Sequence, residues 1–324
     1  MLVNISLIIA TYNRGSAIAP TLTSALQQSV PVDELIVVDD GSTDDTANWV
    51  RENFPSIKLI TKKNGGTSSA RNAGARSAGG DWLMFLDHDD LLLPSAVECL
   101  VGLSQQYLEA ASLHADHIYD NVASGVRHEN HHYTLPAFRR LLDTEAVNQM
   151  SNSRLYGYPL YRSLLRGNLL QQPYMVRRSV FEAIGGYSED VRYCEDWDLY
   201  LRIAQQYQVA VADDVISRHV IEGENLHLTA AEKQELMYER VLRRRWRSHR
   251  WLQVTENRIA RQKLAAIYKT QGDRAWREGT GSVAWRKYLG SALNWPFDHV
   301  VLARLLWWAV PAIGDLRRAD VESV

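Results

Sequence analysis

The sequence predicts an α/β fold in which a mostly parallel sheet is flanked by helices. Over the first 120 residues, short apolar segments alternate with helical stretches, and the connections between them are short. This alternation is typical of βαβ units, whose strands run parallel to one another. Later in the chain the composition changes, since seven of the ten tryptophans lie after residue 240. We therefore expect an α/β domain over residues 1–226, followed by a helical region over residues 227–324.

The expected strands are short apolar runs, each separated from the next by a helix. Near-continuous apolar runs are typical of parallel strands that are buried on both faces. Ser42, with Asp45 three residues later, resembles a capping box at the start of the second helix. In the first half we expect strands at residues 3–10, 34–38, 57–61 and 82–86, and helices at residues 16–28, 43–53 and 68–77. Further along we expect a strand at residues 174–176 and helices at residues 179–184 and 195–206.

One apolar run ends abruptly in a cluster of carboxylates. Residues 81–90 read Asp-Trp-Leu-Met-Phe-Leu-Asp-His-Asp-Asp. Open α/β sheets bind ligands at the carboxyl ends of their strands. Asp87 and Asp89 alternate across His88, so one carboxylate can face a ligand while the other binds a hard cation such as Mg2+ or Mn2+. Taken alone, the run is more typical of a solvated acidic turn before a helix that Pro94 begins.

Composition and charge exclude several classes of protein. The formal net charge of -2 gives no reason to expect a nucleic-acid partner. Two cysteines cannot form a disulfide framework, and no basic leader precedes the first strand, so we expect a cytoplasmic protein. The first strand is followed by neither a G-x-G-x-x-G fingerprint nor a phosphate loop, which argues against ordinary NAD enzymes and phosphate-loop ATPases. No run reaches the ~20 apolar residues that span a bilayer.

Two further acidic pairs lie next to helix starts. Asp39 and Asp40 follow the second strand, and Glu195 and Asp196 begin a predicted helix. The helix dipole favours carboxylates in a first turn, so helix capping explains both pairs without any catalytic role. Residues 64–66, Asn-Gly-Gly, either bring backbone close to a ligand or form a tight turn.

Five motifs that follow one another in order resemble those of family 2 glycosyltransferases. They are Ser6 to Arg14, Glu34 to Asp44, Asn64 to Gly66 with Ala70 to Gly74, Asp87 to Asp89, and Gly185 to Tyr187 with Glu195 and Asp196. The resemblance covers residues 3–226, and the last hundred residues carry no such signature. It implies a GT-A fold, with a nucleotide-sugar-binding half over residues 1–120 and an acceptor-binding half over residues 121–226.

The resemblance implies a binding site for a nucleotide-sugar donor. Tyr12 would pack near the base, Asp40 would hydrogen-bond its imino edge, and Asp39 would support Asp40 or reach the ribose. Arg71 would approach the diphosphate, where a guanidinium binds two oxygens at once. Asp87 would contact the ribose or the donor sugar. The complete set expected to bind the donor is Thr11, Tyr12, Asp39, Asp40, Asn64, Arg71 and Asp87.

The resemblance also implies a cation site and a catalytic base. Asp89 would bind Mg2+ or Mn2+ between the two phosphates, and His219 resembles a histidine that closes over the diphosphate or the metal. Asp196 would accept the proton of the acceptor hydroxyl, with Glu195 orienting the acceptor or the base. Direct displacement by a single base inverts the anomeric configuration, and this step rests on the resemblance.

The implied function is that of an inverting, metal-dependent glycosyltransferase. It would use a UDP- or dTDP-sugar and a saccharide or lipid-linked acceptor, in the synthesis of a cell-surface polysaccharide or a lipid-linked oligosaccharide. A nucleotide-sugar-binding scaffold protein without turnover is the alternative. A nucleotidyltransferase is disfavoured, because its glycine-rich, basic loop after the first strand is missing.

Tryptophan and arginine residues are concentrated near the carboxy terminus. Trp295, Trp307 and Trp308 lie close to Arg304 and to several leucines. Such residues beside an apolar helical face suit peripheral contact with the inner face of a membrane. They suit packing against the catalytic domain, or against a second copy in a homo-oligomer, at least as well.

Overall fold

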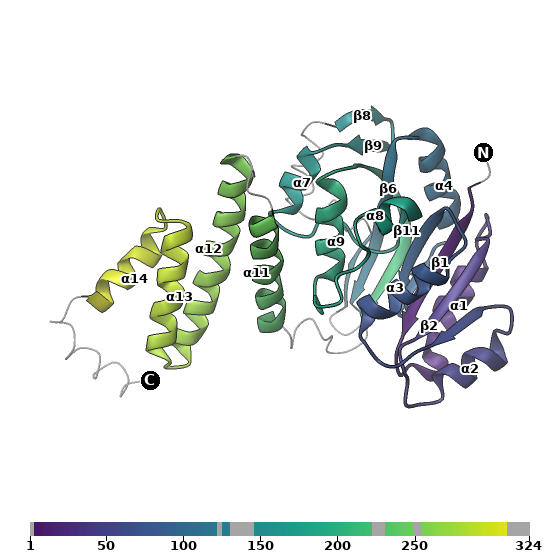
Figure 1. Cartoon of the computed structure of the whole chain (residues 1–324), viewed down its shortest axis with the longest axis horizontal. Helices are drawn as coiled ribbons and strands as arrows, with labels where there is room; N and C mark the ends of the chain where they lie inside the picture. Colours follow the sequence, from purple (N-terminus) through teal and green to yellow (C-terminus); the bar gives the residue numbers. More distant parts are fainter. Residues whose placement is uncertain (1–2, 122–124, 130–145, 222–230, 249–253, 310–324) are drawn as a thin grey trace. The chain divides into compact units, whose positions relative to one another are not determined.

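The computed structural model describes residues 3–121, 125–129, 146–221, 231–248 and 254–309 (Figure 1). The chain divides into two compact units, Met1–Ala230 and Ala231–Val324. The first unit is built on one mixed β-sheet with helices on both faces, and the second unit is helical.

The amino-terminal half of the sheet is parallel, as the alternation of strands and helices predicts. Its strands lie in the order β3-β2-β1-β4. The strands are β1 (Ile5–Thr11), β2 (Glu34–Asp39), β3 (Lys58–Thr61) and β4 (Trp82–Asp87). The elements between them are the 3-10 helix η1 (Gly15–Ile18) and the helices α1 (Ala19–Leu26), α2 (Thr46–Asn53) and α3 (Thr67–Ser77).

The sheet continues beyond β4 with strands of mixed direction. The strand β10 (Tyr174–Arg177) runs antiparallel to both β4 and β6 (Ala110–Asn121), and β6 runs parallel to β11 (Gln208–Ile221). The far edge holds β9 (Ser153–Tyr156) and β8 (Ala146–Met150), while β5 (Asp90–Leu92) pairs with β11 and β7 (Val126–His128) with β6. The remaining helices of this unit are α4 (Ala96–Gln106), α7 (Pro159–Leu164), α8 (Arg178–Ala183) and α9 (Glu195–Ala204).

The central strand β1 is buried on both faces by different helices. Ile5, Leu7 and Ile9 belong to the apolar core that α1, α2 and α4 cover on one face. Ile8 points to the other face, where α3 packs so closely that a Cβ at Gly74 would lie 2.5 Å from Ile8 Cγ2. This close approach lets α3 pack directly against β1.

The long strands β6 and β11 were not expected from the sequence. In the middle of its run, β6 buries several polar side chains, among them Ser112, His114 and Asp116. These side chains have partners in the core: Ser112 Oγ lies 2.9 Å from His114 Nε2, and the His114 ring stacks on Tyr174. Buried polar residues interrupt the apolar run that identifies a strand, so local pattern alone does not reveal β6.

The second unit contains the helices α11 (Ala231–Ser248), α12 (Val254–Arg277), α13 (Gly281–Asn294) and α14 (His299–Ala309). Small residues let α12 and α13 pack closely, since a Cβ at Gly272 would lie 2.8 Å from the Tyr288 ring. Within the described part of the chain, no helix is both long and apolar enough to cross a membrane. The side chains of Trp307 and Trp308, in the predicted carboxy-terminal patch, lie outside the described residues.

Candidate active site

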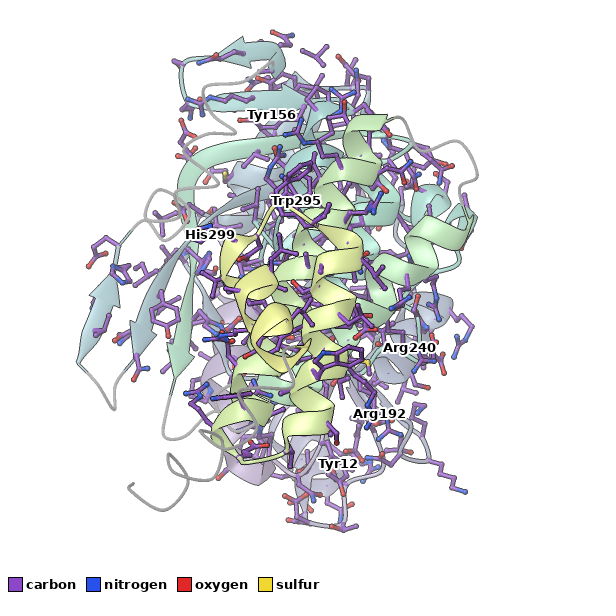
Figure 2. All side chains as sticks on the ribbon, turned by 90° about the vertical axis from the view of Figure 1, so that its left-hand side faces the viewer. Tyr12, Tyr156, Arg192, Arg240, Trp295 and His299 are labelled. Carbon is purple, nitrogen blue, oxygen red and sulfur yellow. The ribbon has the colours of Figure 1, made fainter. Side chains whose placement is uncertain are left out.

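The predicted site residues meet at the carboxyl ends of neighbouring strands. The β-sheet register places Thr11 opposite Asp39, and Ala10 opposite Asp87. Tyr12 follows β1 directly, and its side chain is 44% exposed (Figure 2). The carboxyl ends of parallel strands therefore bring together residues that lie more than 70 positions apart in the sequence.

Asp40 joins the loop after β2 to the loop after β3. Its carboxylate accepts hydrogen bonds from Lys62 Nζ at 2.6 Å and from the backbone N–H of Gly66 at 2.6 Å, and Gly65 N lies 3.1 Å from both oxygens. Gly41 has φ +75°, and a Cβ there would lie 2.7 Å from the backbone nitrogen of the Asn64 peptide. The segment from Asn64 to Gly66 is therefore more than a turn, because its amides bind a buried carboxylate.

Asp39 and its neighbours organise the loop before α2. The Asp39 carboxylate accepts hydrogen bonds from the Ser42 hydroxyl and backbone N–H, and the same hydroxyl accepts from Asn13 N at 2.9 Å. The predicted capping box is wrong, because the N-cap of α2 is Asp45, without a side-chain cap hydrogen bond, and the Thr46 N–H donates to Asp44 Oδ1 at 3.0 Å. Ser42 thus connects the end of β2 with the loop after β1.

Arg71 on α3 links the end of β4 with the start of α9. Its guanidinium is ion-paired with Asp87, and Nη1 donates to Glu195 Oε1 at 2.9 Å. It also lies over the Tyr187 ring, with 5.1 Å between its Cζ and the ring centroid. The Gln172 amide, oriented to suit both neighbours, accepts from Arg71 Nη2 at 2.8 Å and donates to Asp87 Oδ1 at 3.2 Å.

The charge of this cluster is balanced inside the protein. Burial lowers the pKa of Arg71, but Asp87, Tyr187 and Glu195 together raise it well above its ordinary value. Burial raises the pKa of Asp87, but Arg71, His88 and His219 together lower it below its ordinary value. Arg71 is only 3% exposed, and its protein contacts alone explain its position.

Glu195 and Asp196 begin α9, immediately after Cys194, which has a left-handed backbone conformation with φ +63°. Asp196 Oδ1 accepts from Trp197 N at 2.7 Å, and Oδ2 accepts from Asn168 Nδ2 at 2.9 Å. Burial and the neighbouring Glu195 carboxylate raise the pKa of Asp196 to about 7. A carboxylate with such a pKa suits proton transfer near neutral pH.

Asp89 and His219 lie on two neighbouring segments. The Asp89 carboxylate is exposed, 3.3 Å from Arg14 Nη2. His219 Nδ1 lies 2.7 Å from Asp90 Oδ1, because β11 pairs with β5 in a register that sets His219 opposite Asp90. Burial lowers the pKa of His219, but the Asp90 carboxylate raises it to about 9, while burial raises the pKa of Asp90 to about 6.

Asp89 and His219 are the residues of this region that the sequence predicts to bind a cation. A carboxylate that holds one imidazole nitrogen fixes the ring and directs the other nitrogen to a ligand. Among the residues that the structure describes, no group of three or more His, Cys, Asp or Glu side chains is arranged to hold a metal ion. Mg2+ commonly takes only one or two protein carboxylates and completes its shell with water and substrate phosphates. The prediction for Asp89 and His219 is of this second kind, in which the substrate supplies part of the shell.

The sequence reading missed three contributors to the site. Asp90 orients His219, Asn168 binds Asp196, and Gln172 bridges Arg71 and Asp87. Asn168 and Gln172 come from a stretch without recognisable motifs, and only the fold brings them to α9 and β4. Asp90 is the last residue of the acidic run at residues 81–90. Its place directly after Asp87 and Asp89 was the signal in the sequence that could have identified it.

Solved structures with the same fold bind nucleotide sugars. One is residues 1–349 of Staphylococcus aureus TarS in complex with UDP-GlcNAc, with a TM-score of 0.60, 16% identity, and coverage of 93% of this chain and 88% of that chain. Another is the mannosyltransferase PcManGT from Pyrobaculum calidifontis in complex with GDP-Man and Mn2+, with a TM-score of 0.58, 17% identity, and coverage of 98% and 83%. These likenesses confirm the predicted GT-A fold with a carboxy-terminal helical region.

Curated relatives share more of the sequence. An uncharacterized glycosyltransferase of Haemophilus influenzae is 28% identical over 203 residues, which is 62% of this chain and 62% of that protein. The chondroitin synthase of Escherichia coli is 27% identical over 236 residues, 71% of this chain but 31% of that protein. The uncharacterized glycosyltransferase YwdF of Bacillus subtilis is 30% identical over 209 residues, 63% of this chain and 69% of that protein. The chain thus covers less than two thirds of the first two relatives.

A sequence model of the family described as Glycosyl transferase family 2 matches residues 6–171, which are 166 of the 324 residues. The matched segment contains β1 to β4 and therefore the acidic ends of β2 and β4. With the named relatives and the shared fold, this match confirms the resemblance that the motifs indicate. The chain belongs to glycosyl transferase family 2.

Proposed function

We propose that the chain is an inverting, metal-dependent glycosyltransferase that moves a sugar from a UDP- or dTDP-sugar to an acceptor hydroxyl. The observation that carries this proposal is the position of Asp196. Its carboxylate has a pKa of about 7 and lies beside Glu195, which Arg71 ties to Asp87 at the end of β4. A base and a donor-binding edge are therefore linked through one buried guanidinium.

In the proposed reaction, Asp196 accepts the proton of the acceptor hydroxyl as that oxygen attacks the anomeric carbon. The bond to the nucleoside diphosphate breaks on the opposite face, so the configuration inverts. Arg71 holds Glu195 and Asp87 in place, and its charge stabilises the negative charge that develops nearby. Asp89 and His219 would hold Mg2+ or Mn2+, which supplies positive charge to the leaving diphosphate.

The donor site is assigned to the edge formed by β1 and β2. Tyr12 offers an exposed ring for the base, and the residue before it, Thr11, lies opposite Asp39 in the sheet and accepts a backbone hydrogen bond from Asp40. Asn64 is held close by the contact of Gly41 with its backbone. Thr11 offers a buried hydroxyl that has no hydrogen-bond partner among the described residues.

The donor base and the acceptor rest on weaker support. TarS binds UDP-GlcNAc, which favours a uridine donor, while PcManGT binds GDP-Man on the same fold, so the fold itself does not select the base. The Escherichia coli relative is a chondroitin synthase, which supports an acceptor in polysaccharide synthesis. A lipid-linked oligosaccharide acceptor offers a comparable hydroxyl.

A mass-spectrometric screen of UDP-, dTDP- and GDP-sugars tests this proposal. We expect slow hydrolysis, and faster turnover with saccharide acceptors, only with UDP- or dTDP-sugars. Binding of nucleotide sugars without any turnover, across all donors and acceptors, would favour the scaffold protein instead. Turnover of a GDP-sugar alone would keep the enzyme but refute the donor assignment.

The same assay tests the cation. We expect excess EDTA to abolish turnover and added Mg2+ or Mn2+ to restore it. Asp89→Ala should lower turnover by about 10²-fold or more, because a cation at a phosphoryl group supplies several kcal/mol. Asp45→Ala, at another acidic position near a helix start, is the control and should retain full activity. Unchanged turnover in EDTA would refute the cation assignment.

Asn168→Ala should lower the fraction of Asp196 that is ionised at neutral pH, without affecting donor binding. Its amide donates to the ionised carboxylate of Asp196 at 2.9 Å, and a hydrogen bond to the charged form lowers a pKa. Removing the amide should raise the pKa of Asp196, move the acidic limb of the pH–rate profile to higher pH, and lower kcat at pH 7 by about tenfold.

Asn152→Ala is a matched control, because Asn152 Nδ2 donates to Asp214 Oδ2 at 3.0 Å in an exposed asparagine–aspartate pair. Its pH–rate profile should equal that of the wild type. If Asn168→Ala lowers kcat without moving the limb, Asn168 acts on the acceptor and not on Asp196.

A further inference from the structure

The two units of the chain carry opposite charge. Residues 231–324 contain 18 Lys and Arg against 10 Asp and Glu, a formal charge of +8, whereas residues 1–230 contain 18 against 28, a charge of -10. The sum is the nearly neutral -2 of the whole chain. A unit with this charge is attracted to anionic surfaces.

One end of the helical unit presents apolar and cationic side chains together. We call it the apolar tip; it consists of Arg258, Arg261, Leu293, Trp295 and Phe297, from the start of α12, the end of α13 and the turn before α14. Arg261 Nη2 donates to the backbone oxygen of Leu293 at 2.8 Å. Arg258 lies over the Trp295 ring at 5.5 Å, and the Trp295 and Phe297 rings meet edge to face at 5.3 Å.

The tip exposes large apolar side chains that lie outside the hydrophobic core of the helical unit. Phe297 is 75% exposed and Leu293 is 68% exposed. Figure 2 shows Trp295 and His299 close together on the helical unit, at this turn. Asp298, which follows Phe297 directly, is already paired with Lys269 at 3.0 Å.

We propose that the apolar tip docks on an anionic lipid bilayer. Arg258 and Arg261 would contact lipid phosphates, and Leu293 and Phe297 would enter the boundary between headgroups and acyl chains. Trp295 would lie at the interface, where an indole ring meets both apolar and polar surroundings. The helical unit would hold the enzyme at a membrane surface by one end.

Two other occupants explain the tip less well. A soluble polyanion would bind the arginines but would leave Leu293 and Phe297 in water. Contact between the tips of two copies would bring together two units that each carry a charge of +8, which repel one another. A lipid surface satisfies the charge and the apolar side chains at once.

Co-sedimentation of the full chain with vesicles tests this proposal. We use phosphatidylcholine vesicles with and without an equal share of phosphatidylglycerol, at low and high salt. The wild type should sediment with the anionic vesicles at low salt and remain in the supernatant with phosphatidylcholine alone. Leu293→Ser with Phe297→Ser should lower the partition coefficient by about tenfold, and Arg258→Gln with Arg261→Gln should lower it by about fivefold per arginine.

Leu108→Ala is the matched control, because Leu108 is 73% exposed but belongs to the α/β unit; its partitioning should equal that of the wild type. Circular dichroism establishes that every variant is folded. The proposal is overturned if the wild type does not sediment with anionic vesicles, or if the variant with Leu293→Ser and Phe297→Ser binds them as well as the wild type. It is equally overturned if the wild type dimerises without lipid and this variant does not. The assay involves no turnover, so its outcome is independent of the proposed reaction.

Discussion

Asp196→Asn is expected to lower kcat for sugar transfer by about 10²- to 10⁴-fold, the contribution of a positioned general base. The amide keeps the shape of the side chain but cannot accept the proton of the acceptor hydroxyl. Glu195→Gln should lower kcat less, because Glu195 would orient groups and not accept the proton. Equal losses in both variants would contradict the assignment of Asp196 as the base.

The dependence of the wild-type kcat on pH should show the titration of Asp196. Because burial and Glu195 raise the pKa of Asp196 to about 7, the base is protonated in acid, and kcat should rise with pH through about 7. In Asp196→Asn this limb should be absent from the residual activity. A wild-type profile that is flat between pH 5 and 8 would show that no group with this pKa limits the reaction.

The contribution of Asp196 to the free energy of unfolding should fall as pH rises, whereas kcat rises. Its folded pKa of about 7 lies above the ordinary value of 3.8, so the folded protein binds an extra proton between these two pH values. Stability contributed by this group is present in acid and is lost as pH rises through about 7. Asp196→Asn should therefore raise Tm relative to the wild type more at pH 8 than at pH 5.

Arg71→Ala is expected to abolish transfer and to lower the free energy of unfolding by about 3–5 kcal/mol. The guanidinium is buried and pairs with Asp87 and Glu195, and its loss leaves two carboxylates without a cation. Arg71→Lys keeps the charge but cannot reach both partners in the same way, so it should recover part of the stability and little activity.

Arg76→Ala is the matched control for urea unfolding, because Arg76 lies on the same helix and is exposed. It should unfold like the wild type. If Arg71→Ala unfolds at the same urea concentration as Arg76→Ala, the carboxylates do not need Arg71, and the proposed link between β4 and α9 is wrong.

The parallel half of the fold could be predicted from the sequence because its signals are local. The run before Asp87 is apolar since β4 is covered on both faces, and Gly74 is small because α3 lies against Ile8. The ends of these strands then carry Asp39, Asp40 and Asp87, and the register brings them to one edge. Local pattern and fold agree here.

In the second half, the predictions of β10, α8 and α9 are confirmed, but β6 and β11 could not be predicted, because their signals are tertiary. β6 buries polar residues such as His114 that find partners on β10, so its sequence does not read as an apolar strand. Asn168 and Gln172 reach Asp196 and Arg71 only through folding. Arg71 itself was expected at a diphosphate, and the structure shows that its nearest partners are protein carboxylates.

Calorimetric titration of Asp196→Asn with the nucleotide sugar that the wild type consumes is the most direct test of the proposed chemistry. If Asp196 is the base, the variant should bind the donor with the affinity of the wild type, in the presence of the cation, while transfer is lost. Binding that disappears together with transfer would show that Asp196 holds the site together, and that the base lies elsewhere.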